Sequence, residues 1–495
     1  MKKTSNLLLS VLAVVLSAGI IFSGCSKKEE TKKKEKKNGK KTEESVDETE
    51  DETDGTDGTE KTEDSSKESS AESSETKETA EFDIGEMDPY DAGMDYYFGA
   101  HGKEYNRDHA EKAFQMAADA GDSRGYFGLG LIRRERYMDE DHYQKAMEYF
   151  EKAIEMNCPE GLCGKASLYE SAWGVNYDVD LAFSLYKQAA DQGCAFGYTG
   201  MGQMYRTGMS GFSTPGPEHA LACYQLAIEC DDWYASMYAT NAIGNLYSSG
   251  CGTQPQDFEK ALEWYRKAEE GDYTPATYNI GRRYNAGEGV TKDPVKAREY
   301  FESAASRGNA DAACEIGWMY ERGIGVEQSE KEAEKWYILS YQNGSRSGAY
   351  DLGCLYLFAK EITPDYALML TCFELTAKDG YAASYGRLGY IYSEGIGVSK
   401  DDVKAVEWWS KGVEESDSTS ASNMGWASQY GKGGVKQDYE AALDYYAMAI
   451  YFTYFDGNTS TEEYARSAIE KMVTDGNITQ EQADAALQKV ADLIA

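Results

Sequence analysis

The sequence predicts an all-α protein: a solenoid of about ten stacked helical hairpins, each about 36 residues long. Three observations predict this fold class. A small residue followed three positions later by a tyrosine recurs at a nearly constant interval. A second segment with helical spacing of its apolar residues follows each recurrence. The 495 residues include 49 Gly but only 8 Pro, so Gly recurs without the composition of a disordered chain.

Residues 1–24 are predicted to be the signal peptide of a lipoprotein. Lys2 and Lys3 precede an apolar stretch that ends at Phe22, the charged and apolar regions of an export signal. The alternative is an uncleaved membrane helix, but such a helix needs about 20 apolar residues. The segment Phe22-Ser23-Gly24-Cys25 resembles a bacterial lipobox, in which Leu is usual where Phe22 stands. The resemblance implies that Cys25 receives diacylglycerol.

Residues 25–86 are predicted to be a disordered linker. Residues 27–41 contain nine Lys and three Glu, whereas residues 42–86 contain 19 acids and three Lys. These residues include few apolar side chains, and burying so few cannot offset the entropy of ordering the chain. The two acyl chains at Cys25 would anchor the protein stably, with the lysines next to anionic lipid. We therefore expect the protein at the outer face of the bacterial cytoplasmic membrane, with this linker as a spacer.

The first half of each repeat, between residues 87 and 455, contains an anchor residue with a small side chain. Eight of the ten anchors have Tyr three positions later, and Arg133 and Ser428 are the exceptions. The spacing between anchors is 36 or 37 residues, apart from one interval of 42. The anchors are Gly93, Gly130, Ala166, Gly202, Gly244, Gly281, Gly317, Gly353, Gly389 and Gly425.

The second half of each repeat is predicted to be a capped helix that pairs with the first. Asp293 precedes Pro294, as expected for a helix N-cap followed by its first turn. Ala297, the pair Tyr300-Phe301 and Ala304 then fall on one helical face. Gly308 suits a left-handed C-terminal cap. The unit is therefore a helical hairpin, and hairpins of this kind become stable by stacking.

Gly-x-Gly-Val sequences begin at Gly287, Gly323 and Gly395. A phosphate-binding loop is disfavoured, because no strand precedes them and no Lys-Ser/Thr follows. Their repetition in register predicts the turn within each hairpin.

The combined pattern G-x-x-Y-x-x-G-x-G-V…D-x-x-K-A-x-x-W/Y-Y/F-x-K-A-A-x-x-G is similar to the Sel-one-like repeat (SLR), a relative of the tetratricopeptide repeat. The residues between Gly317 and Gly344 and between Gly389 and Gly412 carry it most completely. The resemblance implies a right-handed superhelix that binds proteins or peptides, often as an adaptor.

Residues 456–495 are predicted to form two further helices that cap the array. Ser460 with Glu463, and Thr479 with Gln482, have the spacing of capping boxes.

No catalytic, cofactor-binding or metal-binding residues are predicted. The four His belong to no ligand cluster, and nucleophile motifs do not occur. A net charge of -36 repels phosphate backbones, so a nucleic acid partner is not expected. Of ten Cys, nine remain after Cys25, and most are expected to be small buried residues. Cys158 and Cys163 are the sequence-local pair that could form a disulfide.

A candidate ligand groove follows from the residue one past each anchor, which points roughly opposite the packed arc of its helix. In the later repeats this position holds Trp318, Cys354, Tyr390 and Trp426. An exposed row of aromatic residues suits a peptide or an extended, glycan-like ligand. The alternative is that these side chains pack against the neighbouring hairpin.

These features predict a cell-surface binding scaffold for an unidentified protein or peptide, and not an enzyme. One alternative is an envelope enzyme of the cysteine-rich repeat type credited with β-lactam or peptidoglycan-related activity. That resemblance depends on regularly spaced cysteine pairs in each repeat, which this chain lacks. The other alternative is a passive structural spacer.

Overall fold

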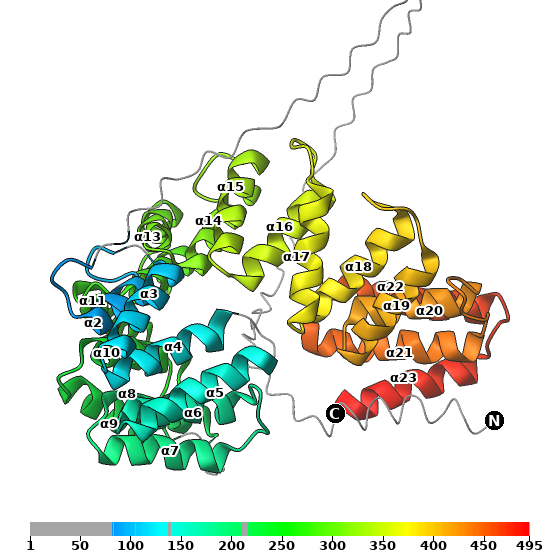
Figure 1. Ribbon diagram of the computed structural model, residues 1–495. Helices are drawn as coiled ribbons and strands as arrows, with labels where there is room; N and C mark the ends of the chain where they lie inside the picture. Colours follow the sequence, from blue (N-terminus) through cyan, green and yellow to red (C-terminus); the bar gives the residue numbers. More distant parts are fainter. Residues whose placement is uncertain (1–81, 83, 104, 137–139, 210–215, 495) are drawn as a thin grey trace, which may run out of the picture. The chain divides into compact units, whose positions relative to one another are not determined.

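The computed structural model describes residues 82, 84–103, 105–136, 140–209 and 216–494. The predicted signal peptide, Cys25 and nearly all of the predicted linker therefore lie outside the described residues. From residue 84 onward the described residues belong to one compact unit. They form a succession of α-helices (Figure 1). The only β-type pairing within the described ranges is an isolated bridge between Cys251 and Gln254. The predicted all-α solenoid of hairpins is confirmed.

Each of the ten repeats contains a first helix, called helix A, and a second, called helix B. The A helices are α2 (Pro89–Phe98), α4 (Ser123–Arg136), α6 (Pro159–Ser171), α8 (Ala195–Thr207), α10 (Trp233–Ser249), α12 (Thr274–Ala286), α14 (Ala310–Arg322), α16 (Arg346–Phe358), α18 (Ala382–Glu394) and α20 (Ser418–Tyr430). The B helices are α3 (Arg107–Asp119), α5 (Glu140–Glu155), α7 (Val179–Asp191), α9 (Pro217–Glu229), α11 (Phe258–Glu270), α13 (Pro294–Ser306), α15 (Glu330–Gln342), α17 (Tyr366–Lys378), α19 (Asp402–Glu414) and α21 (Tyr439–Asp456).

The predicted caps set where the B helices begin and end. The side chain of Asp293 accepts a hydrogen bond from the backbone N–H of Lys296 at 3.0 Å, and Pro294 occupies the first turn. This satisfies one of the amide hydrogens that have no partner within the helix. After α13, Gly308 has a φ of 89°, the left-handed conformation expected after a helix. The capping prediction is confirmed in this repeat.

The Gly-x-Gly turns join helix A to helix B. Gly323 and Gly325 follow α14 with φ angles of 67° and 68°. A Cβ on Gly325 would lie 3.0 Å from the Cβ of Pro294, the first residue of the preceding B helix. The second glycine is thus required by a positive φ and by close packing between repeats. The prediction that this motif is a structural turn is confirmed.

The anchor glycines make room for an aromatic ring of their own hairpin. A Cβ on Gly317 would lie 2.6 Å from the ring of Tyr337 in α15, and one on Gly281 would lie 2.7 Å from the ring of Phe301 in α13. Both rings are fully buried. The hydroxyl of Tyr337 also donates to Glu321 in α14 at 2.7 Å. Each hairpin is therefore held together by the ring that sits against its anchor.

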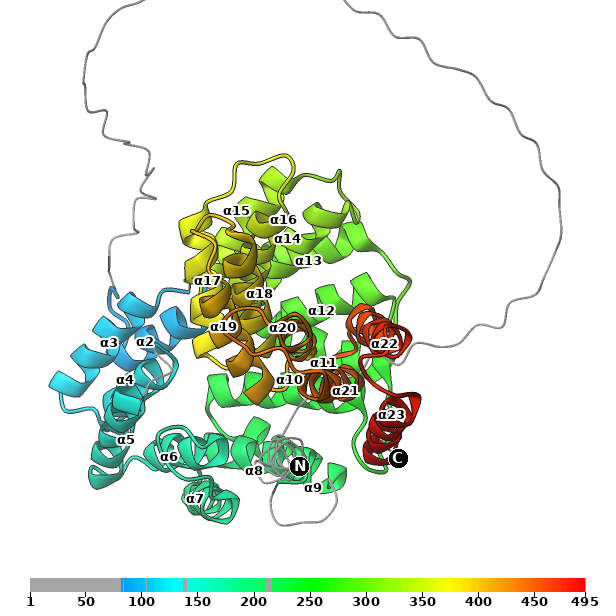
Figure 2. The same cartoon turned by 90° about the vertical axis from the view of Figure 1, so that its right-hand side faces the viewer.

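The A helices form the inner layer of the array. Direct contacts between successive A helices join α2 to α4, α4 to α6, α6 to α8, α8 to α10, α14 to α16, and α18 to α20. Contacts between successive B helices are weaker among the described residues. The exception is the contact of α21 with the helix over residues 480–494. Helices on the inner side of a curved stack approach one another more closely than those on the outer side. The A helices accordingly present an inner face, and the B helices cover the outside (Figures 1 and 2).

The first hairpin packs against the fifth and sixth repeats. The hydroxyl of Tyr234 in α10 donates to Asp95 in α2 at 2.7 Å. The hydroxyl of Thr274 in α12 donates to the carbonyl oxygen of Gly99 at 3.1 Å. His101 contacts the same Asp95 carboxylate, which is 1% exposed, through Nδ1 at 2.7 Å. This contact between repeats distant in sequence was not predicted.

Two helices follow the tenth repeat, α22 (Thr459–Thr474) and α23 (Gln480–Ile494). The N-cap of α22 is Asn458, whose side chain accepts from the N–H of Thr461, so the predicted cap at Ser460 is wrong. Asn458 takes the role because the helix begins at Thr459. The second capping box is confirmed: Thr479 and Gln482 each accept from the backbone N–H of the other. α22 packs on α20 as a further A helix would. The described helices include none with the length and apolar character to cross a bilayer.

Candidate ligand-binding surface

The last four A helices, which belong to the inner layer, carry large aromatic side chains that are exposed or half-buried. These residues stand one or five positions after the anchor, and positions four apart share a helical face. Phe358 is 53% exposed, Tyr430 47% and Tyr390 40%, while Trp318 and Trp426 are half-buried. We call these five residues of α14, α16, α18 and α20 the inner aromatic surface. The anchor of each of these A helices packs against a ring of its own B helix, and the positions one and five later are turned about 100–140° from the anchor around the helix.

The predicted groove residues lie on this surface but pack to different degrees. Trp318 packs against two buried clusters, one extending from the fifth to the seventh repeat and the other from the seventh to the ninth. Trp426 meets the buried ring of Trp409 edge to face, with 6.4 Å between ring centroids. Tyr390 is the most exposed of the predicted residues, and Cys354 is half-buried. The two tryptophans thus contribute to packing between hairpins and still leave part of their rings accessible. Their role in binding a ligand stays a prediction.

Phe358 and Tyr430 were not predicted. The predicted row holds only the residue one past each anchor, whereas these two stand four residues later on the same helices. The spacing of four was the signal that would have found them, because it places a side chain one turn further along the same face.

One arginine connects the exposed rings to the layer beneath them. The guanidinium carbon of Arg387 in α18 lies 5.4 Å from the ring centroid of Phe358 in α16. Its Nε donates to the hydroxyl of Tyr350 at 3.3 Å. The ring of Tyr350 in turn lies 4.7 Å from that of Tyr381, which is 41% exposed. A cation over an aromatic face contributes about 0.5–1 kcal/mol at an exposed site. This chain of contacts fixes the position of Phe358 relative to α18.

Two carboxyl groups near this surface titrate close to neutral pH. Burial raises the pKa of Asp351 in α16 to about 6, and its Oδ2 accepts from the Cys314 thiol at 3.2 Å. Burial also raises the pKa of Asp417 to about 6. Asp417 caps α20 by accepting from the N–H of Ser420 at 2.7 Å. The charge of the inner layer in these repeats therefore changes around pH 6.

The cysteines of the described chain are free thiols. Cys158 donates to a carboxylate oxygen of Glu160 at 3.0 Å. The sulfur of Cys163 instead lies 3.9 Å from that of Cys194, in the following repeat. The sequence-local pair of Cys158 and Cys163 is thus not joined here, because Cys163 faces the next A helix. The described residues contain no group of three or more His, Cys, Asp or Glu arranged to hold a metal ion.

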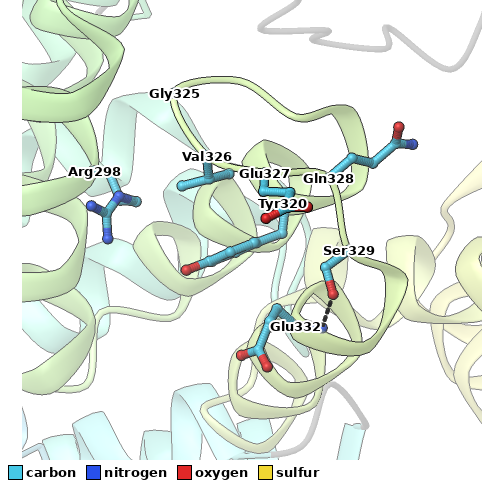
Figure 3. Close-up of a pocket in the computed structure, with 8 residues that line it drawn as sticks. All are labelled: Arg298, Tyr320, Gly325, Val326, Glu327, Gln328, Ser329 and Glu332. Carbon is cyan, nitrogen blue, oxygen red and sulfur yellow. Dashed lines mark hydrogen bonds between the residues drawn. The ribbon is translucent and has the colours of Figure 1, made fainter.

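A hollow of about 560 Å³ lies at the turn edge of the sixth and seventh repeats. In Figure 3 the ring of Tyr320 stands in its middle, with the hydroxyl on the side of Arg298. Arg298 is paired with Glu302 at 2.5 Å. A B helix, the Gly-x-Gly turn of the next repeat and the start of the following B helix form this hollow. Its lining is Arg298, Tyr320, Gly325, Val326, Glu327, Gln328, Ser329 and Glu332. It carries no cluster of reactive groups and ranks below the inner aromatic surface as a candidate.

Comparison with known families accounts for the whole array of hairpins. The Sel1 repeat model matches ten consecutive segments: 90–122, 124–158, 162–194, 195–232, 238–273, 274–309, 310–345, 346–381, 382–417 and 418–451. The chain belongs to the Sel1 repeat family. Sel1-repeat solenoids are in general helical scaffolds without catalytic activity that bind protein partners.

Two curated relatives share part of this array. Chitin synthase regulatory factor 3 of Schizosaccharomyces pombe is 27% identical over 188 residues, which are 37% of this chain and 20% of that protein. The ERAD-associated E3 ubiquitin-protein ligase component HRD3B of Arabidopsis thaliana is 24% identical over 205 residues, which are 39% of this chain and 31% of that protein. The chain therefore spans between a fifth and a third of the length of these relatives.

Solved Sel1-repeat structures are similar as well. A protective antigen of uropathogenic Escherichia coli with an SLR fold has 24% identity and a TM-score of 0.42, covering 82% of this chain and 91% of that chain. A Sel1 repeat protein of Oxalobacter formigenes has 26% identity and a TM-score of 0.41, covering 64% of this chain and 89% of that chain.

Proposed function

We propose that this Sel1-repeat protein is a lipid-anchored scaffold at the outer face of a bacterial cytoplasmic membrane. In this proposal it holds an extended segment of a partner protein against the inner aromatic surface. The observation that carries the proposal is the exposure of Phe358, Tyr390 and Tyr430, at 53%, 40% and 47%, on successive A helices. Exposed aromatic rings in a row are the side chains that contribute most to protein–protein affinity.

The spacing of the A helices fits a short extended peptide. Directly packed helices stand about 8–10 Å apart, as α14 and α16 or α18 and α20 do. An extended chain advances about 3.4 Å per residue, so about three residues would cross each of these pairs. Arg387, held by Tyr350, places a positive charge beside the Phe358 ring, where a peptide carbonyl or carboxylate would find a partner. These features favour a peptide with apolar side chains separated by polar ones.

The cysteine arrangement favours a scaffold over the enzyme alternative. That alternative depends on cysteine pairs within each hairpin. The close pair in this chain is Cys163 on α6 and Cys194 at the N-terminus of α8. These two helices belong to different repeats.

Site-directed changes with matched controls test the binding surface. Phe358→Ser and Tyr390→Ser remove exposed rings from the A helices. Val403→Ser and Leu375→Ser remove apolar side chains of equal exposure, 54% and 40%, from the B helices α19 and α17. The full chain would be screened against a displayed library of peptides from exported proteins of the producing bacterium. We expect the first two variants to weaken binding of the selected peptides about tenfold or more, because central aromatic contacts typically contribute 2 kcal/mol or more.

The control variants should bind as the unaltered chain does. Equal weakening by Leu375→Ser and Tyr390→Ser would overturn the proposed surface. Selection of no saturable peptide would instead support the passive spacer.

The lipid anchor has a separate test. Cells that produce the full chain would be labelled with a radioactive fatty acid and separated into membrane and soluble fractions. We expect the label in the membrane fraction with Cys25 present, and loss of the label in Cys25→Ala. Retention of the label in the variant would contradict lipid attachment at Cys25.

A further inference from the structure

Two buried thiols from neighbouring repeats face each other in the inner layer. Cys163 lies on α6 in the third repeat, and Cys194 is the N-cap residue of α8 in the fourth. Their sulfurs are 3.9 Å apart although 31 positions separate them in the sequence. Cys163 is 6% exposed and Cys194 5%, inside an apolar cluster that also holds Leu185 and Tyr186. The cluster excludes water and keeps the two sulfurs next to each other.

The nearby cysteines have other partners. Cys158 donates to Glu160 at 3.0 Å. Cys230, the C-cap residue of α9, donates to the carbonyl oxygens of Leu226 at 3.3 Å and of Gly193 at 3.9 Å. The geometry therefore selects one pairing among the four thiols of this region.

We propose that Cys163 and Cys194 are a site of reversible oxidation, at which a disulfide joins the third repeat to the fourth. A disulfide requires an S–S distance of about 2.05 Å, so the sulfurs must approach by about 1.9 Å. Because α6 and α8 already contact each other, rotation of two short side chains provides most of this movement. The bond would tie two A helices of the inner layer together.

The oxidant belongs to the class of small-molecule disulfides. One protein thiolate attacks a sulfur of the small disulfide, forms a mixed disulfide and releases one small thiol. The second protein thiolate then attacks the protein sulfur of the mixed disulfide and releases the other small thiol. The two protein sulfurs lose two electrons in total, and the two sulfurs of the small molecule gain them. The two protons of the protein thiols pass through solvent to the released thiols.

Burial determines the rate of this reaction. It raises the pKa of the Cys163 thiol well above its usual range, so little thiolate is present in the folded chain. We therefore expect slow oxidation of the native protein and faster oxidation while the α6–α8 contact is open, as during folding.

The test uses the full chain, reduced and then incubated with oxidised glutathione. One sample stays native, and the other is unfolded in urea and refolded in the same oxidant. Free thiols are blocked after acid quenching, and peptides are mapped by mass spectrometry. We expect a peptide pair that joins residues 163 and 194 and has lost two hydrogens, forming faster in the refolded sample. The oxidised chain should melt about 3 °C or more above the reduced one, because a disulfide constrains the unfolded state.

Two serine variants make the result specific. Cys158→Ser should keep both the joined peptide pair and the rise in melting temperature. Cys194→Ser should lose both and retain glutathione on Cys163 after refolding. A bridge between Cys158 and Cys163, glutathione adducts without a bridge in the unaltered chain, or free thiols at both positions after refolding would each overturn the proposal.

Discussion

At the scale of single residues, the burial of Asp351 makes the stability of the fold depend on pH. Burial raises its pKa to about 6, against about 3.9 for an exposed aspartate. The folded chain therefore binds this proton more tightly than the unfolded chain. The resulting contribution to stability is fully present below the unfolded pKa and is lost as pH rises through the folded one. Between pH 4 and pH 7 this group favours folding less and less.

Replacing Asp351 by Asn tests that assignment. Asn keeps an oxygen that can accept from the Cys314 thiol but carries no charge at neutral pH. We expect Asp351→Asn to raise the free energy of unfolding by about 1–2 kcal/mol at pH 7.5 and to change it little at pH 4.5. Urea unfolding followed by circular dichroism at several pH values measures this.

Glu374→Gln on the exposed side of α17 removes the same charge and serves as the control. A stabilisation by Asp351→Asn that does not vary between pH 4.5 and 7.5 would contradict the shifted pKa.

At the scale of the element, the hairpin depends on a ring packed against a glycine. Gly317 allows Tyr337 to lie against the backbone of α14, and Tyr337 also bonds to Glu321 on the same helix. A methyl group on Gly317 would have no space, because the fully buried ring of Tyr337 already fills that position. Overpacking of this kind typically costs 1–3 kcal/mol.

Gly317→Ala should therefore lower the free energy of unfolding by about 3 kcal/mol. Gly380→Ala is the matched comparison, because Gly380 has a φ of 77° and open space around its Cβ position. There we expect only the cost of the left-handed conformation, about 1 kcal/mol. Thermal and urea unfolding of both variants measure the difference. An equal loss in the two would show that steric contact at the anchor is unimportant.

At the scale of the whole molecule, the first hairpin is tied to the fifth and sixth repeats. Asp95 is buried and is satisfied by Tyr234 from α10 and His101 from its own repeat. Phe98 stacks on Tyr234, with 5.6 Å between ring centroids. In a linear stack each repeat contacts only its neighbours. This contact therefore couples the two ends of a five-repeat segment.

Tyr234→Phe should loosen that coupling. The variant leaves a buried carboxylate without one of its donors, which costs about 1–3 kcal/mol. Hydrogen exchange should become faster throughout α2 and α3, while α16 to α20 stay unchanged. Tyr337→Phe removes a hydroxyl bond within a single hairpin and should accelerate exchange only near α14 and α15. Unchanged exchange in α2 and α3 of Tyr234→Phe would show that the hydroxyl does not hold the first hairpin in place.

Much of the fold could be predicted because the repeat period exposes local rules. Caps such as Asp293, the glycines of the turns and the capping box at Thr479 depend on residues within four positions of one another. The candidate surface was predicted in part: its first row followed from the anchors. Phe358 and Tyr430 were missed because exposure depends on which neighbouring helices cover a face, and this is a property of the packed array.

The sequence by itself determined the ten hairpins, their turns and most of their caps, because these depend on backbone conformation and on contacts within one repeat. The tertiary structure alone decided three things: the contact of Asp95 with Tyr234, the facing thiols of Cys163 and Cys194, and the exposure of Phe358. Each depends on how far successive hairpins rotate against one another. That rotation is the sum of many small side-chain contacts between repeats, and no local pattern in the sequence records it.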